Sequence, residues 1–205
     1  MVNNTVKKYE LINNLNEKKT IIEESINNIL LALGEDIHRE GLIETPKRVA
    51  EMYLEVFQGI TLSNQKIAEM YNKCFSISSS EIVIVKDIPT FSYCEHHMAL
   101  MFNMSISVGY IPNKKVIGLS KIARISELVC KRLQIQERIG KDIFEVLNII
   151  LDTDDIIVKI DSEHSCMRSR GVKVGNSMTT TYYCGGLFKE ETERRKEFFN
   201  LCQTK

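Results

Sequence analysis

The spacing of apolar residues changes near residue 76 of the 205-residue chain. Up to that point they recur every three or four positions, which is typical of an amphipathic helix. Beyond it, several short stretches alternate apolar and polar residues, which is typical of a half-buried strand. The alternation predicts strands over 81–87, 101–112, 155–164 and 177–184, and helical spacing predicts helices over 120–132 and 136–152.

The first 75 residues are predicted to be helical after a loose or partly helical start of about 17 residues. Gly34 suits a helix C-cap, and Thr45 followed by Pro46 suits an N-cap and a first helical position. Together with a charged helix at the end of the chain, the predicted helices cover 18–33, 45–58, 64–74 and 189–202.

Strand pairs that flank a helix pair favour an α+β fold, with an antiparallel sheet and the helix pair on one face. We expect an N-terminal helical region over residues 1–75 and an α+β domain over residues 76–205. Four strands leave two open sheet edges, and open edges invite pairing with another chain. We therefore expect the sheet to continue across subunits of a homo-oligomer.

The charge and cysteine content narrow the class of protein. The 27 basic residues balance the 27 acidic ones, so no nucleic-acid partner is expected. No apolar run has the length of a signal peptide or a membrane span, so we expect a cytoplasmic protein without a membrane partner. Six cysteines are too few for a secreted disulfide scaffold. Cys74, Cys130 and Cys202, each in a helical pattern, are predicted to be buried thiols.

The stretch SYCEHH, residues 92–97, gathers a cysteine and two of the four histidines. Cys94 and His97 suit two ligands of one metal ion if the chain turns there, because residues three apart in a strand face opposite sides. A third ligand is expected from EHSC, where Cys166 follows His164. We predict that zinc is held by Cys94, His97 and Cys166, with His96 and His164 left free for proton transfer.

A structural zinc site is the main alternative. It would need a fourth protein ligand, for which His164 and Cys184 are the candidates. The other zinc patterns, such as His-Glu-x-x-His and paired Cys-x-x-Cys, do not occur in the sequence. His38 lies in a polar region and is predicted to be a solvated surface residue.

Basic residues near the ends of predicted elements suggest an anion site. Ser120, Lys121 and Arg124 open a predicted helix, whose free N–H groups favour phosphate. Spacing alone favours the interpretation that Lys121 and Arg124 lie on a solvated helix face. Arg170 follows Cys166 closely and must lie near the metal if that cysteine is a ligand. A polyphosphate next to a metal site is the resulting hypothesis.

Taken together, these segments resemble GTP cyclohydrolase I, from about Gly34 to the C-terminal helix. The stretches that carry the resemblance are GEDIHREGLIETPKRVAEMY, SYCEHH, GYIPNKKVIGLSKIARI, QIQERIGKDI, EHSCMRSRGVK and TTTYYCGGLF. Several long motifs in the same order are far more specific than any one of them.

The resemblance implies that GTP and water are converted into 7,8-dihydroneopterin triphosphate and formate, the entry step to folate and other pterins. It implies zinc on the three ligands named above, where the metal activates the water that attacks C8 of the purine. His164 would donate a proton to the opening imidazole ring, with His96 as its partner. The residues that match substrate contacts are Arg48, Ser120, Lys121, Arg124, Gln136, Glu137 and Arg170, with Gln136 and Glu137 as the guanine-reading pair.

The resemblance also implies a fold of the tunnelling-fold type, a homodecamer, and sheets closed into a barrel across subunits, with residues 76–205 as the catalytic domain. Two departures from the family pattern are the stretch Met98–Phe102 and Glu51, and they bear on local packing and substrate affinity. One alternative is a zinc-dependent relative that acts on another purine or pterin. The other is a zinc-stabilised module that binds GTP or a pterin without turnover, and it predicts four protein ligands on the metal.

Overall fold

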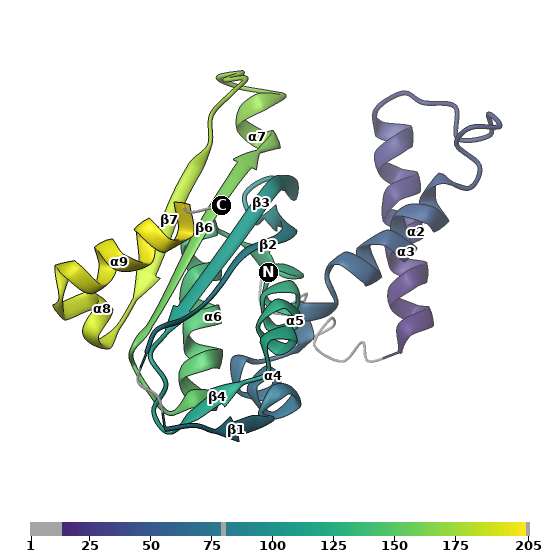
Figure 1. Cartoon of the computed structure of the whole chain (residues 1–205). Helices are drawn as coiled ribbons and strands as arrows, with labels where there is room; N and C mark the ends of the chain where they lie inside the picture. The colour runs from purple at the N-terminus through teal and green to yellow at the C-terminus, as the bar shows by residue number, and fades with distance from the viewer. Residues whose placement is uncertain (1–13, 79–80, 204–205) are drawn as a thin grey trace, which may run out of the picture. The chain divides into compact units, whose positions relative to one another are not determined.

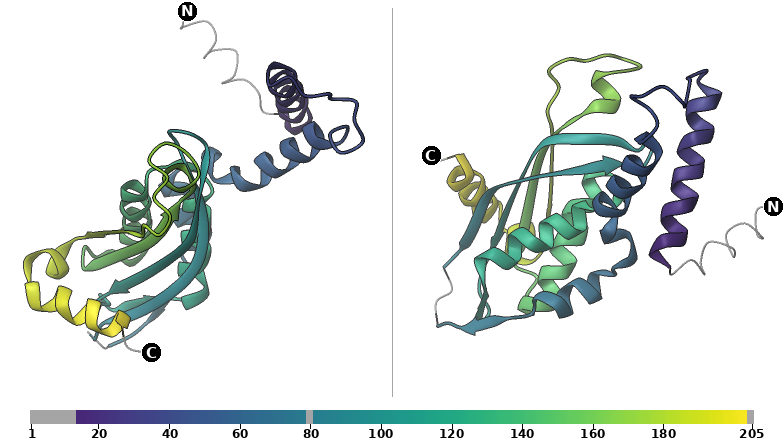
Figure 2. Two further views of the ribbon diagram at one scale, coloured as in Figure 1. Left: turned by 90° about the horizontal axis from the view of Figure 1, so that it is seen from above. Right: turned by 90° about the vertical axis from the view of Figure 1, so that its right-hand side faces the viewer.

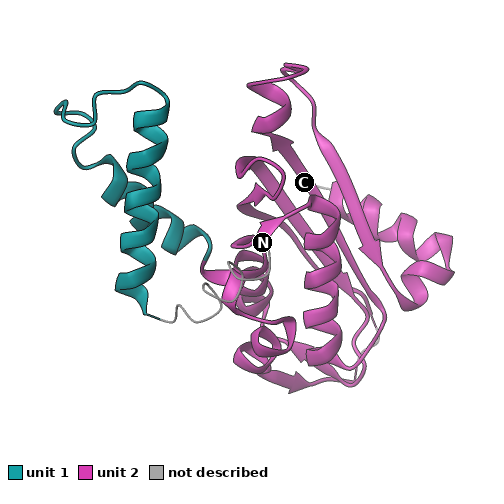
Figure 3. Ribbon diagram, turned by 180° about the vertical axis from the view of Figure 1, so that it is seen from behind, with its two compact units in different colours: residues 1–57 teal, residues 58–205 magenta. Residues whose placement is uncertain are grey.

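The computed structural model describes residues 14–78 and 81–203 (Figure 1). Chain contacts divide it into two compact units, one up to Phe57 and one from Gln58 onward (Figure 3). We call them the first and the second unit. The predicted α+β class is confirmed, because helices and strands share the second unit. Among the described residues, no helix is both long and apolar enough to cross a membrane.

The first unit is a pair of packed helices, α2 (Leu15–Ala32) and α3 (Thr45–Val56). The Asn14 side chain caps α2 by accepting a hydrogen bond from the backbone N–H of Asn16, so this helix begins earlier than predicted. Gly34 has φ of +83°, as its predicted role after a helix end requires. The predicted extension over the first 13 residues lies outside the described residues.

The start of α3 differs by one residue from the prediction. Thr45 is the first helical residue rather than the N-cap, and Glu44 precedes it without a capping side-chain bond. Pro46 is the second helical residue rather than the predicted first, and it still lies in the first turn, where a missing N–H costs nothing. His38 is exposed, in agreement with the predicted surface position.

The second unit contains nine elements before β6 and five from β6 onward. The first eight are η1 (Gln58–Thr61), α4 (Asn64–Tyr71), β1 (Cys74–Ser76), β2 (Val83–Cys94), β3 (Ala99–Tyr110), β4 (Lys115–Ile117), α5 (Leu119–Cys130) and β5 (Leu133–Gln134), followed by α6 (Gln136–Leu151). The remaining elements are β6 (Ile156–His164), α7 (Ser165–Arg168), β7 (Thr179–Cys184), α8 (Gly186–Glu190) and α9 (Thr192–Gln203). Cys74 therefore begins a strand, and its predicted place in a helix is wrong.

The main sheet has the strand order β5-β2-β3-β6-β7. All neighbours are antiparallel except β5, which runs parallel to the end of β2, so the sheet is mixed rather than purely antiparallel as expected. A small second sheet pairs β1 with β4. Strand β2 continues well past the predicted residue 87, through Pro89. This proline is tolerated because β5 pairs only with Tyr93 and Cys94, which leaves the edge beside Pro89 open.

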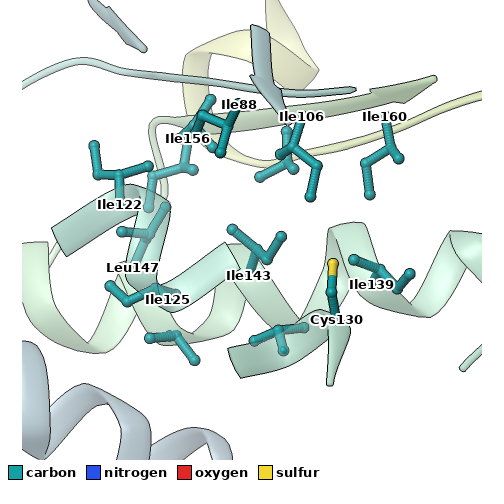
Figure 4. Packing of buried hydrophobic residues seen from close by; sticks show 14 of the residues in the cluster. Ile88, Ile106, Ile122, Ile125, Cys130, Ile139, Ile143, Leu147, Ile156 and Ile160 are labelled. Atoms are coloured by element: carbon teal, nitrogen blue, oxygen red, sulfur yellow. The ribbon is translucent and has the colours of Figure 1, made fainter. Parts of the chain in front are cut away.

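The main core lies between the sheet and helices α4, α5 and α6. Figure 4 shows Ile106 and Ile160 from the sheet facing Ile139 and Ile143 from α6. All four side chains have no exposed surface. Burial of such side chains is the main term that stabilises the fold, at roughly 1.5–3 kcal/mol each. The predicted helix pair thus covers one face of the sheet.

A second, smaller core covers part of the opposite face. Side chains alternate along β6, so Ile157 faces away from the main core and packs with Phe188 of α8 and Phe198 of α9. Figure 2 shows α9 on the other side of the sheet from α5 and α6. A Cβ on Gly109 of β3 would lie 2.7 Å from the Phe198 ring, so glycine is required for this close approach.

Candidate metal centre

Three side chains that could hold a metal ion meet at one end of the sheet. One ligand atom from each of Cys94, His97 and Cys166 lies within 4.8 Å of the others. Cys94 is 5% exposed, Cys166 is half-buried and His97 is exposed. The group therefore lies where the sheet surface opens to solvent, as a site that admits a small molecule requires.

The β2–β3 connection aims Cys94 and His97 at one point. Cys94 pairs with Ala99 at the last step of the ladder, and the four residues between them form a tight turn. Met98 completes this turn with φ of +50°, a left-handed conformation that is uncommon for a residue with a side chain. The predicted turn between Cys94 and His97 is confirmed.

Cys166 reaches the same point from β6. Met101 of β3 pairs with His164, the last residue of β6, so the chain that follows emerges beside the β2–β3 turn. The Ser165 hydroxyl donates a hydrogen bond to the carbonyl oxygen of Leu100 at 2.7 Å. This bond fixes the first turn of α7, which carries Cys166.

The donor set fits zinc. Two sulfur atoms and one imidazole nitrogen match its preferred ligands, and tetrahedral Zn–S bonds would separate the two sulfur atoms by about 3.8 Å. Across residues 14–78 and 81–203, no fourth His, Cys, Asp or Glu joins the group. Cys184 lies in the second core and contacts the carbonyl oxygen of Phe188. Three protein ligands leave a coordination position for water.

His96 and His164 lie beside this group with different partners. His96 Nδ1 is 3.4 Å from the Cys94 sulfur atom. His164 Nε2 is 2.8 Å from Oε1 of Gln136. Burial lowers the pKa of His164, and the nearby Glu137 carboxylate acts in the opposite direction. Burial raises the pKa of the Cys166 thiol, and Cys94 raises it further, so a metal must displace protons to bind here.

The predicted guanine-reading pair opens helix α6. Glu137 is exposed, and it lines an open cavity of about 440 Å³ with Ile135, Arg138, Lys141 and Tyr183 among the other wall residues. Gln136 is only 2% exposed, and its amide is bonded within the protein. The two neighbours therefore face different surroundings.

Only one of the predicted basic contacts is adjacent to the metal ligands. Arg170 Nη1 is 2.5 Å from Nε2 of His97. Ser120, Lys121 and Arg124 lie in the first half of the 12-residue helix α5, which is about 18 Å long. The far end of α5 is the one near the metal group, because Ser92 donates a hydrogen bond to the carbonyl oxygen of Cys130. Arg48 is exposed on α3 of the first unit.

An ion pair that supports the metal group was not expected from the sequence. Arg138 of α6 donates hydrogen bonds to both carboxylate oxygens of Glu95, at 2.6 and 3.3 Å. The backbone N–H of Glu95 also bonds to the carbonyl oxygen of Gln134. These contacts join the turn between Cys94 and His97 to the start of α6. Glu95 and Arg138 are 43 positions apart, so no local sequence pattern indicates that they form a pair.

An α+β fold whose mixed sheet carries a Cys-His-Cys group that could hold a metal ion, with two further imidazoles beside it, is that of a candidate metal-dependent enzyme. The family model of GTP cyclohydrolase I matches residues 22–203, and the chain belongs to this family.

The chain is similar to curated relatives over most of their length. The chain is 57% identical to GTP cyclohydrolase 1 of Clostridium acetobutylicum over 175 residues, which cover 83% of this chain and 90% of the relative. It is 52% identical to GTP cyclohydrolase 1 of Clostridium beijerinckii over 182 residues, 86% of this chain and 92% of the relative. Identity to GTP cyclohydrolase 1 of Ruminiclostridium cellulolyticum is 54% over 177 residues, 83% and 91% of the two chains.

Proposed function

We propose that this protein is a zinc-dependent GTP cyclohydrolase that converts GTP and water into 7,8-dihydroneopterin triphosphate and formate, the first step of folate and pterin synthesis. The observation that carries the proposal is the group of Cys94, His97 and Cys166 with His96 and His164 beside it. A purely structural metal site does not require two further imidazoles beside its ligands. Family membership supports the same reaction.

Zinc is the proposed metal, held by the Cys94 and Cys166 sulfur atoms and the His97 imidazole. When bound, it would supply Lewis-acid activation of water near neutral pH. Cys94 is almost fully buried, which suits a ligand that anchors the ion from the protein side. His97 and the open side of the group leave room for the purine ring.

The two other histidines are the proposed proton carriers. His164 donates a proton to the ring nitrogen that is released when the imidazole ring of the purine opens, and His96 exchanges protons with it. Burial keeps the pKa of His164 below its ordinary value, which favours a neutral ring able to accept and return a proton near neutral pH. Proton transfer by positioned groups contributes roughly 10²–10⁴-fold to rate.

Glu137 is the proposed reader of guanine. Its carboxylate is exposed in the first turn of α6 and accepts hydrogen bonds from the N1 and N2 donors of the base. Adenine offers no donors in these positions, so ATP would leave the carboxylate unpaired and is rejected. Gln136, the other residue of the predicted pair, is almost fully buried.

The phosphates are proposed to bind Ser120, Lys121, Arg124 and Arg170, with Arg48 as a further basic contact. The start of α5 lies about 18 Å from the end of this helix that is near the metal ligands. Ser120, Lys121 and Arg124 would therefore bind substrate in the site of another copy of the chain. This supports the proposed homodecamer, in which sheets close into a barrel and active sites lie between subunits. Mixing the Lys121→Ala and His164→Ala variants should then restore activity, because some sites would combine two intact contributions.

Formate release from GTP, with zinc content measured on the same sample, is the experiment that tests the proposal. Formate together with a pterin that fluoresces after oxidation establishes the cyclohydrolase. Zinc without formate would favour the alternative, a zinc-stabilised module that binds GTP or a pterin without turnover. That alternative lacks support in the three-ligand group, because a closed structural site needs a fourth ligand.

The proposed organisation is an N-terminal helical region over residues 1–75, which supplies Arg48, and a catalytic α+β domain over residues 76–205. A cytoplasmic location is also proposed. All six cysteines are free thiols, as a reducing compartment would keep them.

A further inference from the structure

Gln136 is the first residue of α6, and its side chain is bonded at both ends. Nε2 donates hydrogen bonds to the carbonyl oxygens of Ile160 at 3.0 Å and Thr179 at 2.9 Å. Oε1 lies 2.8 Å from Nε2 of His164. The residue is 2% exposed.

These partners fix which way the amide points. Carbonyl oxygens only accept hydrogen bonds, so the NH₂ group must face Ile160 and Thr179. A flipped amide would set its oxygen against two other oxygens. The Gln136 oxygen therefore faces His164, and Nε2 of His164 must carry a hydrogen to bond to it. In a neutral imidazole, Nδ1 is then the atom without a hydrogen.

We propose that Gln136 is a positioning residue for His164, and that it does not read the guanine base with its side chain. It holds the ring in one orientation and one tautomer, so that Nδ1 is the atom of His164 that accepts and returns the proton during turnover. This inference rests on the proposed function, because it assigns an atom within the proposed proton transfer.

The alternative, a guanine contact, conflicts with the hydrogen-bond count. Guanine O6 and N7 accept hydrogen bonds, and both N–H groups of Gln136 are already donated to the backbone. A contact with O6 or N7 would have to break at least one of these two bonds at a side chain that is only 2% exposed, which costs free energy. Glu137, the next residue, is exposed and has no such constraint. The two residues of the predicted pair thus separate into one that orients a histidine and one that recognises a base.

The test compares turnover with GTP affinity in the zinc-loaded protein. Gln136→Met keeps the side-chain length and removes the bonds, and we expect kcat to fall roughly 10–100-fold, the usual cost of losing a group that orients a functional histidine. GTP affinity is measured on the His164→Ala background, where turnover is weak. There we expect Gln136→Met to change the Kd less than twofold and Glu137→Gln to weaken it more than tenfold.

Gln134→Met is the matched control for loss of a buried amide. Gln134 is 1% exposed and donates to Asp142, which keeps bonds to Arg132 and Asn64. We expect its kcat to stay within twofold of wild type. An equal fall in kcat for both glutamine variants would overturn the inference, because it would reflect general destabilisation near α6.

A double-mutant comparison and a second substitution make the test independent of folding. Gln136→Met added to His164→Ala should lower the residual kcat no further, since the group that it positions is gone. Gln136→Glu keeps an acceptor for His164 and should recover part of the lost kcat. Additive losses, or a Kd for GTP that rises with an unchanged kcat, would overturn the inference.

A readout without GTP separates this inference from the proposed function. In protein labelled with ¹⁵N-histidine, magic-angle-spinning NMR distinguishes protonated from unprotonated ring nitrogens, and the His164→Ala spectrum assigns the signal. We expect protonated Nε2 in wild type and a tautomer mixture in Gln136→Met. The same tautomer in both would overturn the inference even if formate is released. Failure of wild type to release formate, with the expected spectra, would instead count against the proposed function alone.

Discussion

Arg138 and Glu95 form a two-point ion pair that joins the start of helix α6 to the turn between two proposed metal ligands. The bonds to Arg138 hold the pKa of the Glu95 carboxyl below its ordinary value. Since Glu95 follows Cys94 directly and precedes His97 by two residues, the pair restricts how the turn can move. It connects the element that is proposed to read the base with the element that is proposed to hold zinc.

Arg138→Met is predicted to lower zinc affinity about tenfold, because contacts that orient ligands have effects of this size. Competition with a chromogenic chelator measures the affinity. Lys141→Met is the matched control, because Lys141 lies on the same helix and pairs with Glu145 instead of the turn. Equal affinity in wild type and Arg138→Met would mean that the turn holds its shape without the ion pair.

The zinc content of alanine variants should distinguish the metal ligands from the proton carriers. Cys94→Ala, His97→Ala and Cys166→Ala are predicted to lose most of the metal, because two remaining ligands bind zinc weakly. His96→Ala and His164→Ala should retain about one zinc per chain and lose roughly 10²–10⁴-fold in kcat. Elemental analysis after dialysis gives the zinc content. Zinc loss from both of the last two variants would show that the ligands are misassigned.

Glu137→Gln is predicted to lower kcat/KM for GTP by at least about 100-fold, because an amide cannot replace a carboxylate that accepts two donors. Inosine triphosphate, which lacks the N2 donors, provides the control on the substrate side. Wild type should prefer GTP over inosine triphosphate, and the variant should lose most of that preference. An unchanged preference would place guanine recognition elsewhere.

The metal group was predictable because its signals are local. Cys94 and His97 lie in one turn, and Cys166 is near the only other histidine of the predicted sheet region, so residue types alone suggested the set. The Gln136–His164 and Arg138–Glu95 contacts connect segments 28 and 43 residues apart. Such pairs depend on how the elements pack, which apolar spacing does not specify.

The fold was predictable to a similar degree. The long helices α5 and α6 have a strong apolar period and were found nearly to the residue. The second half of β2 was missed because Asp87, with φ of +57°, and Pro89 interrupt the alternation. Strand β5 has two residues and exists only through its pairing with Tyr93 and Cys94. A stretch of two residues is too short to show a repeat of apolar residues.

The Cys130 thiol is predicted to be inert in the folded protein. Burial raises its pKa to about 12, so almost no thiolate forms at pH 8. Its folded pKa exceeds the unfolded value of about 8.5, so its contribution to stability is complete below that pH. The contribution is lost by up to about 1.4 kcal/mol per unit as pH rises toward 12. Iodoacetamide labelling with peptide mapping should modify Cys130 only after unfolding, and labelling of the folded protein at pH 8 would contradict this.

Gly109→Ala is predicted to destabilise the second core without affecting the metal centre. The new methyl group would lie 2.7 Å from Cδ2 of Phe198 and 3.1 Å from Cγ2 of Ile157, so the aromatic ring must shift. Overpacking of this kind costs about 1–3 kcal/mol. The midpoint of urea unfolding, measured at fixed protein concentration, should fall accordingly.

Gly175→Ala is the matched control for Gly109→Ala, because a Cβ at Gly175 would have no neighbour within 4 Å. Phe198→Leu tests whether the Phe198 ring causes the loss of stability in Gly109→Ala. If the ring is what the methyl group meets, Gly109→Ala should cost less in the Phe198→Leu background than in wild type. Zinc content should be the same in wild type and in every one of these variants, since Phe198 packs on the face of the sheet opposite the main core. Equal costs in both backgrounds would mean that the strain arises from Ile157 or from the β3 backbone instead.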